Sequence, residues 1–189
     1  MDVEELLRQN RSFRRFYEDR RLDRATLLDL VGLTRLCPSA ANRQPLKYRI
    51  ACSREDTALV FSHLRWASAL KDWDGPVEGE RPAGYIFILG DTRIATSFNV
   101  DPGIVAQSML LGAVERGLGG CLIGSIDRDK LRRDLAIDDR FAILLAVALG
   151  VPKDNVVLED MQDPDAFDYW RDANGVHHVP KRPLSEVLV

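Results

Sequence analysis

The chain has 189 residues, of which 46% are hydrophobic and 29% charged, and its formal net charge is -3. This balance is typical of an ordinary globular protein that buries a full core without disulfide or metal staples. The small negative charge gives no reason to expect nucleic acid or an anionic membrane as a partner. No apolar run approaches the ~20 residues of a membrane span, and residues 1–5 lack the basic and apolar regions of a signal peptide. We therefore expect one domain, spanning residues 1–189, in the cytoplasm.

The cysteines and histidines predict no metal centre and no dithiol redox site. Cys37, Cys52 and Cys121 are odd in number and form no CxxC pair, and free thiols fit a reducing compartment. His63 is isolated, and the adjacent pair His177–His178 would point to opposite faces of a strand. A shared metal site is therefore not expected.

The first half of the chain predicts helices that precede the first strands. Pro38 disfavours helical geometry in the residue before it, so a helix that begins at Asp23 must end near Cys37. Ser53 followed by Asp56 is a capping box that predicts the start of another helix. In chain order we expect a helix capped by Asp2, a helix from Asp23 to about Cys37, a strand over 48–52, a helix from Ser53 to Leu64 or beyond, a loop over 73–82 and a buried apolar strand over 85–89.

The second half contains the most regular helix, which we expect Asp101 to cap, Pro102 to open and Gly117 to end. The tail from Pro152 has little apolar periodicity, but Asn174–Gly175 is a strong hairpin-turn signal. Helices come first and do not alternate regularly with strands, so the order predicts an α+β fold rather than a Rossmann fold. The remaining expectations are an apolar stripe of Ile104, Val105, Ser108, Leu111 and Val114, a short strand over 121–123, a small charged helix after Asp127 and a central strand over 141–149.

The first chemically informative segment is Arg11–Phe16, which reads Arg-Ser-Phe-Arg-Arg-Phe. A serine between arginines offers one hydroxyl and several guanidinium donors, which suits a phosphate dianion. Phe13 and Phe16, three residues apart, could anchor the segment on the core while its polar side chains face outward. The alternative interpretation is a solvated basic loop, because charge runs are usually surface features.

The loop Pro38–Pro45 carries small residues and two carboxamides, Asn42 and Gln44, between its prolines. Such a loop offers a rigid surface with several donors and acceptors, as a flat aromatic ligand with polar edges requires. The alternative interpretation is an ordinary connection after a helix.

A glycine-rich stretch runs from Gly117 to Gly124. It contains neither GxGxxG nor GK[ST], so it indicates neither familiar kind of nucleotide site. Gly124 follows a predicted strand, where a glycine lets a backbone N–H approach a ligand without side-chain hindrance. The alternative is that Gly124 merely ends the strand.

Taken in order, these segments resemble the nitroreductase family of FMN-dependent oxidoreductases. The matching pieces extend along nearly the whole chain in the family's order and spacing. They are Arg11–Phe16, Pro38–Pro45, the helix from Asp101 through Gln107-Ser108-Met109-Leu110-Leu111 to Gly117-Leu118-Gly119, and Ile123-Gly124.

The resemblance implies a three-layer fold, with a central mixed but mostly antiparallel sheet wrapped by helices, and a homodimer with an FMN site at each side of its interface. It implies that hydride from NADH or NADPH passes through the flavin to an electron-poor acceptor such as a nitroaromatic or a quinone. No catalytic side chain is implied, and the tail 152–189 would pack on the fold or on the partner subunit. By the same analogy the FMN phosphate and ribityl chain would be held by Arg11, Ser12 and Arg14, and Lys181 and Arg182 would close on that phosphate. The flavin of the other subunit would be reached by Pro38, Ser39, Ala40 and Asn42. The reactive ring would lie under Leu122, Ile123 and Gly124, with a backbone N–H aimed at N5.

Two departures from the family pattern concern the site. Asn10 stands where the family often has an arginine, so Arg11 or the tail would have to supply that charge. The chain is short for the helical excursion that longer members place over the substrate channel, and the loop 73–82 or Trp170 would line the channel instead. For a cation at the pyrimidine edge of the flavin, the candidates are Arg14 and Lys71.

Other functions stay open at this point. Relatives on the same fold perform specialised flavin reactions such as reductive dehalogenation and flavin fragmentation, and a non-catalytic flavin carrier or sensor would share the scaffold. A protein-interaction domain without a cofactor is a third possibility, and it would give a colourless purified protein.

Overall fold

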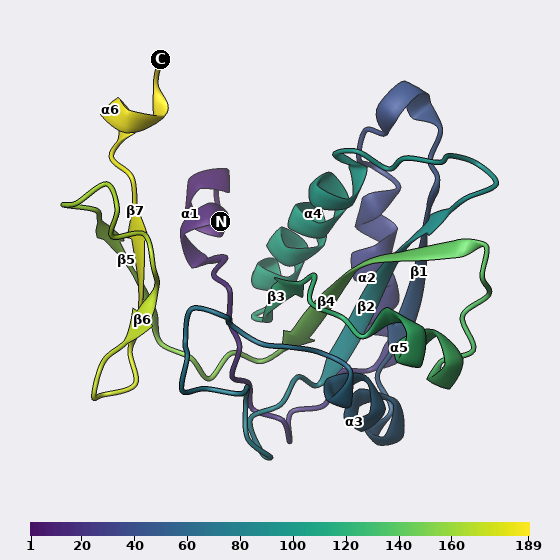
Figure 1. Cartoon of the computed structure of the whole chain (residues 1–189), viewed down its shortest axis with the longest axis horizontal. Helices are drawn as coiled ribbons and strands as arrows, with labels where there is room; N and C mark the ends of the chain where they lie inside the picture. The colour runs from purple at the N-terminus through teal and green to yellow at the C-terminus, as the bar shows by residue number, and fades with distance from the viewer.

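The computed structural model describes the whole chain, residues 1–189, as a helix-wrapped sheet with a smaller sheet beside it (Figure 1). The main sheet has the strand order β1-β2-β4-β3, and every neighbouring pair in it is antiparallel. The tail forms the second sheet, in the order β5-β7-β6. The elements are α1 (Val3–Gln9), α2 (Arg24–Thr34), the 3-10 turn η1 (Ala40–Asn42), β1 (Leu46–Ala51), α3 (Arg54–Ser62), β2 (Gly84–Asp91), α4 (Asp101–Glu115), β3 (Gly119–Ile123), α5 (Arg128–Asp134), β4 (Phe141–Gly150), β5 (Val156–Asp160), β6 (Trp170–Arg171), β7 (His177–Lys181) and α6 (Leu184–Val187).

Two apolar cores lie on opposite faces of the main sheet, because successive side chains of a strand point to opposite faces. Tyr85 and Phe87 of β2 join the core that α3 and α5 cover, whereas Ile86 and Ile88 join the core that α2 and α4 cover. Every residue of β2 is buried, as expected for an apolar strand with both faces covered. The predicted three-layer α+β fold is confirmed; the one parallel pair of strands is β5 and β7 in the tail, and Ser12 forms an isolated parallel bridge with Gly120.

Local capping signals start several helices where the sequence predicts them. The side chains of Asp2, Asp23, Ser53 and Asp127 each accept a hydrogen bond from the backbone N–H three residues further on. A cap of this kind stabilises a helix by about 1 kcal/mol. The longest helix, α4, has 15 residues, and no helix combines the length and the apolar character needed to cross a membrane.

The prediction that Asp101 caps α4 is wrong. The helix begins at Asp101 itself, and Val100 before it provides no side-chain cap. The buried Asp101 carboxylate instead accepts hydrogen bonds from the Ser39 hydroxyl at 2.6 Å and from the Ala40 backbone N–H at 3.1 Å. A partner 62 positions away in the sequence has therefore replaced the local one.

The buried face of α4 is displaced from the predicted apolar stripe. Val105 and Val114 are buried as expected, whereas Ile104, Ser108 and Leu111 are only partly buried. The reason is that α4 packs against both α2 and the sheet, which together cover Ala106, Met109, Leu110, Gly112 and Ala113.

The tail contains more structure than the sequence predicted. The Asn174–Gly175 turn is confirmed, since it joins the antiparallel strands β6 and β7 and gives Gly175 a φ of 79°. Strand β5, which the sequence analysis missed, pairs in parallel with β7. The buried Asp154 carboxylate ties the tail to the N-terminal segment: it accepts from the backbone N–H of Arg14 at 2.8 Å, from that of Arg15 at 2.9 Å and from Arg15 Nε at 2.6 Å.

Candidate functional site

The basic segment Arg11–Phe16 runs along the free edge of β3 and is fixed there by its aromatic residues. The Phe13 backbone N–H donates to the Gly120 carbonyl at 3.1 Å, and the Phe16 side chain is fully buried. A Cβ at Gly119 would lie 2.4 Å from the Phe13 ring, and a Cβ at Gly150 would lie 2.8 Å from the Phe16 ring. These glycines let both rings pack against the sheet, so the predicted anchoring is confirmed.

The polar residues of this segment open into a hollow of about 350 Å³ that we call the cationic hollow. Arg11, Arg14 and Lys181 contribute three positive charges to it, and none of the three forms an ion pair. No carboxylate lines it. The lining residues are Leu7, Asn10, Arg11, Ser12, Arg14, Gln107, Leu110, Leu122, Tyr169, His177, Val179 and Lys181.

Arg11 is partly stripped of water and incompletely hydrogen-bonded. Its Nη2 donates to the Leu7 carbonyl, while its Nε is buried without a partner. Burial lowers the pKa of the Arg11 guanidinium, which nevertheless stays cationic at neutral pH. A buried donor without a partner costs about 1–3 kcal/mol, so the chain itself does not fully compensate the burial of this guanidinium.

Arg14 is held by two aromatic side chains of the tail that the sequence analysis did not single out. Its guanidinium lies 4.6 Å from the centroid of the Tyr169 ring, and its Nη1 is 3.2 Å from His177 Nε2. Burial, followed by the nearby Arg14 charge, lowers the pKa of His177 to about 4. The imidazole is therefore neutral at pH 7 and can accept the hydrogen bond that Arg14 donates.

A second hollow, of about 220 Å³, adjoins the cationic hollow and shares Arg14, Leu122 and Tyr169 with it. Leu122 is the one exposed residue of β3. Burial raises the pKa of the Cys121 thiol to about 12, so this cysteine stays protonated and serves as an apolar wall. The other lining residues are Arg65, Trp66, Ala67, Ser68, Ile123, Gly124 and Ser125.

Gly124 directly follows β3 and lines the second hollow. Neither the backbone conformation nor the packing at this position requires a glycine. A Cβ built there would meet only Leu145 Cδ2, at 3.8 Å, which is an ordinary van der Waals contact. Its φ is also not left-handed. Gly120, in the same stretch, is the opposite case, because a Cβ there would lie 2.2 Å from the Ala148 carbonyl oxygen.

Two of the cations expected from the sequence lie outside both hollows. Arg182 donates to Glu186 at 2.9 Å and to the Pro164 carbonyl at 2.9 Å, because it follows Lys181 in extended chain and points the other way. Lys71 lines neither hollow, whereas Arg65 lines the second. Arg65 lies there because its backbone N–H donates to the Ser125 carbonyl at 3.0 Å, next to Gly124.

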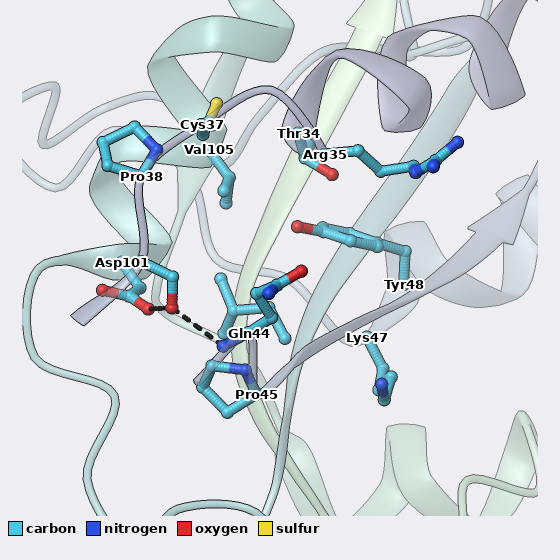
Figure 2. Close-up of a pocket in the computed structure, with 12 residues that line it drawn as sticks. Thr34, Arg35, Cys37, Pro38, Gln44, Pro45, Lys47, Tyr48, Asp101 and Val105 are labelled. Atoms are coloured by element: carbon cyan, nitrogen blue, oxygen red, sulfur yellow. Dashed lines mark hydrogen bonds between the residues drawn. The ribbon is translucent and has the colours of Figure 1, made fainter. Parts of the chain in front are cut away.

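The Pro38–Pro45 loop lies apart from these hollows within one chain. Pro38 and Ser39 line a separate hollow of about 240 Å³, which shares no residue with the other two (Figure 2). The Ser39 hydroxyl donates to Asp101 and accepts from the Gln44 backbone N–H at 3.0 Å. This anchor holds three non-glycine residues in the left-handed region, namely Ala41 (φ 50°), Asn42 (φ 52°) and Gln44 (φ 51°).

The fold and the two adjoining hollows define an α+β protein with a positively charged cleft beside the edge strand β3 of an antiparallel sheet. Residues 7–151 match the model of the Nitroreductase family, and the chain belongs to that family. The tail that carries Tyr169, His177 and Lys181 lies beyond the matched residues.

Individual relatives agree with this assignment. A Methanothermobacter thermautotrophicus protein named NADH dehydrogenase/NAD(P)H nitroreductase is 27% identical over 172 residues, which cover 87% of this chain and 85% of the relative. A nitroreductase family protein from Clostridium difficile 630 superposes with a TM-score of 0.70 at 19% identity, covering 100% of this chain and 98% of its own. A nitroreductase in complex with FMN from Exiguobacterium sibiricum 255-15 gives a TM-score of 0.67 at 17% identity, covering 82% and 90%.

Proposed function

We propose that this protein is an FMN-dependent oxidoreductase that passes hydride from NADH or NADPH to an electron-poor acceptor such as a nitroaromatic or a quinone. The observation that carries the proposal is the cationic hollow, in which three cations without ion pairs face no carboxylate. The membership in the Nitroreductase family supports the class of reaction, and the FMN complex of the Exiguobacterium protein supports the cofactor.

The donor set of the cationic hollow fits a phosphate dianion. Arg11, Arg14 and Lys181 all line it, none of them forms an ion pair, and no acidic side chain lines it beside them. Charge-assisted hydrogen bonds from such groups contribute about 1.5–3 kcal/mol each. In this proposal Arg11, Ser12, Arg14 and Lys181 hold the FMN phosphate and ribityl chain, and Arg182 stabilises the tail instead.

The second hollow fits the flat ring. Leu122 and Ile123 offer an apolar wall, and Gly124 lets its backbone N–H approach N5 without steric hindrance. Arg65 replaces Lys71 as our candidate for the cation at the pyrimidine edge, because it lines this hollow. The bound flavin supplies the hydride chemistry itself. The chain's own residues bind and orient the ring and exclude water from one side of it.

The dimer is part of the proposal. Pro38, Ser39, Ala40 and Asn42 would serve the site of the partner subunit, since they lie apart from the cationic hollow of their own chain. The C-terminus also leaves large apolar side chains exposed, including Leu184, which a second subunit would cover. The whole chain, tail included, would work as one unit in this homodimer.

The absorbance spectrum of the purified protein tests the proposal. We expect bound FMN that NADH or NADPH bleaches rapidly without oxygen and that a nitroaromatic or quinone reoxidises. A colourless protein that binds neither FMN nor riboflavin would refute the proposed function. Bound FMN that neither nicotinamide reduces would favour the alternative of a non-catalytic flavin carrier, and reduction without turnover of those acceptors would favour a specialised flavin reaction.

A further inference from the structure

Strand β7 presents two adjacent histidines to opposite sides of the tail sheet. His177 is buried and faces Arg14, with its ring centroid 5.2 Å from that of Tyr169. His178 stacks on Trp170 at 3.9 Å with nearly parallel planes, and its Nδ1 contacts Glu159. The same kind of side chain therefore has two different settings in one strand, and only His177 touches the cationic hollow.

The Arg14 residue is held at two separate points by the tail. Its backbone N–H donates to the Asp154 carboxylate, which fixes the main chain. Its side chain is held by the Tyr169 ring face and by His177 Nε2. A cation over an aromatic face and a hydrogen bond to a neutral acceptor are both attractive. The guanidinium is thus oriented without any contact to a carboxylate.

The neutrality of these two partners is the important point. Arginine is always protonated and only donates, so His177 Nε2 accepts and the imidazole carries its proton on Nδ1. A carboxylate in the same place would orient Arg14 equally well but would offset its charge. A neutral imidazole and a phenol ring leave the whole positive charge available to an anion in the cationic hollow. The other charged groups near His177 are Arg15, Arg171 and Asp154, of which Asp154 is already engaged by Arg15.

We propose that His177 and Tyr169 are positioning residues that aim the Arg14 guanidinium at the phosphate of the ligand and so set the preference for a phosphorylated flavin. The inference rests on the proposed function, and it assigns a role to tail residues outside the range 7–151 that matches the family. The residues act through Arg14 and do not themselves donate to the phosphate.

The test compares the affinities of the full-length protein for FMN and for riboflavin, measured by quenching of flavin fluorescence. We expect His177→Phe, which keeps a ring but removes the acceptor, to lower the FMN-to-riboflavin preference about threefold to tenfold. Riboflavin affinity should change little. His177→Gln, whose Oε1 can accept from Arg14, should keep most of the preference. His178→Phe is the matched control in the same strand and should leave the preference unchanged.

Each other outcome bears on the inference. Equal losses of FMN and riboflavin affinity in His177→Phe would show a purely structural role and overturn it, as would an unchanged preference. In an Arg14→Ala background, His177→Phe should have no further effect on the preference, because the group it positions is gone. If His177→Phe fails to fold, Tyr169→Leu is the second variant, with the same expected loss of preference. A wild-type protein that binds both flavins equally would instead refute the phosphate assignment on which both proposals rest.

Discussion

Replacing Gly124 separates the needs of the fold from those of the proposed flavin site. A Cβ at this position meets only Leu145, at an ordinary contact distance, so Gly124→Ala should change the free energy of unfolding by less than about 0.5 kcal/mol. Gly124→Val places a branched side chain where we propose that the flavin ring lies. Loss of one aligned donor in a catalytic site costs about 2.7–4 kcal/mol, so reduction of the flavin by NADH or NADPH should slow about a hundredfold.

Stopped-flow absorbance of the FMN-saturated variants under anaerobic conditions measures this rate directly. Thermal unfolding of the same samples measures stability, and the two quantities should separate for Gly124. The matched control is Gly120→Ala in the same glycine-rich stretch. A Cβ there would lie 2.2 Å from the Ala148 carbonyl oxygen, so this variant should lose about 1–3 kcal/mol of stability.

The result that would refute the reasoning is a Gly124→Val protein that retains FMN and is reduced at the wild-type rate. Gly124 would then merely end β3, and the N–H aimed at N5 would have to come from another residue. A Gly124→Ala variant that lost as much stability as Gly120→Ala would contradict the statement that the fold does not require this glycine, because Leu145 is the only neighbour of the added Cβ.

Three further predictions address the phosphate, the dimer and pH. Arg14→Ala should weaken FMN binding about tenfold to a hundredfold and riboflavin binding little, whereas the exposed control Arg8→Ala should change neither; equal weakening of both flavins would contradict the phosphate role. Mixing equal amounts of Arg14→Ala and Asp101→Ala subunits should restore about a quarter of the FMN sites. Asp101 anchors the loop and Arg14 lines the cationic hollow, so only a mixed dimer, at one of its two sites, combines an intact loop with an intact hollow. No restoration would contradict the shared site. The pKa of His177 is about 4 in the folded protein, below its ordinary value of 6.5. As pH falls, the unfolded chain therefore binds a proton at this residue before the folded protein does. The free energy of unfolding should fall by roughly 2–4 kcal/mol as pH drops from 6.5 to 4. His177→Gln should remove that part of the slope in urea titrations, and an identical slope would show that other groups cause it.

The features that the sequence predicted well depend on near neighbours in the chain. Asp2 and Ser53 cap helices through backbone N–H groups three residues on, and Phe13 and Phe16 follow the spacing of an anchored segment. The apolar run of β2 needs both faces covered wherever it lies. Strand β5 was missed because Val156 and Val157 are only half-buried, so its pattern is weak.

The features that the sequence did not predict depend on partners far away in the chain. The carboxylate of Asp154 accepts hydrogen bonds from the backbone N–H groups of Arg14 and Arg15, about 140 positions earlier. Asp101 has the local pattern of a helix cap, but its carboxylate accepts from the distant Ser39 hydroxyl. Nothing local in the sequence indicates that His177 faces Arg14, because 163 positions separate the two residues. Hydrogen bonds of this kind follow from the fold, so they can be read only after the chain is folded.

The distribution of these contacts suggests how the site is divided between chain segments. One tail provides Tyr169, His177 and Lys181 to the same hollow as the N-terminal Arg11 and Arg14, so the proposed phosphate side is complete within a single chain. The strained loop 38–45 is anchored elsewhere, on Asp101, and its hollow shares no residue with the cationic hollow. If both proposals hold, a monomeric variant should still distinguish FMN from riboflavin while losing most of its affinity for the ring. A monomer that bound both flavins weakly and equally would show instead that the phosphate side also needs the second subunit.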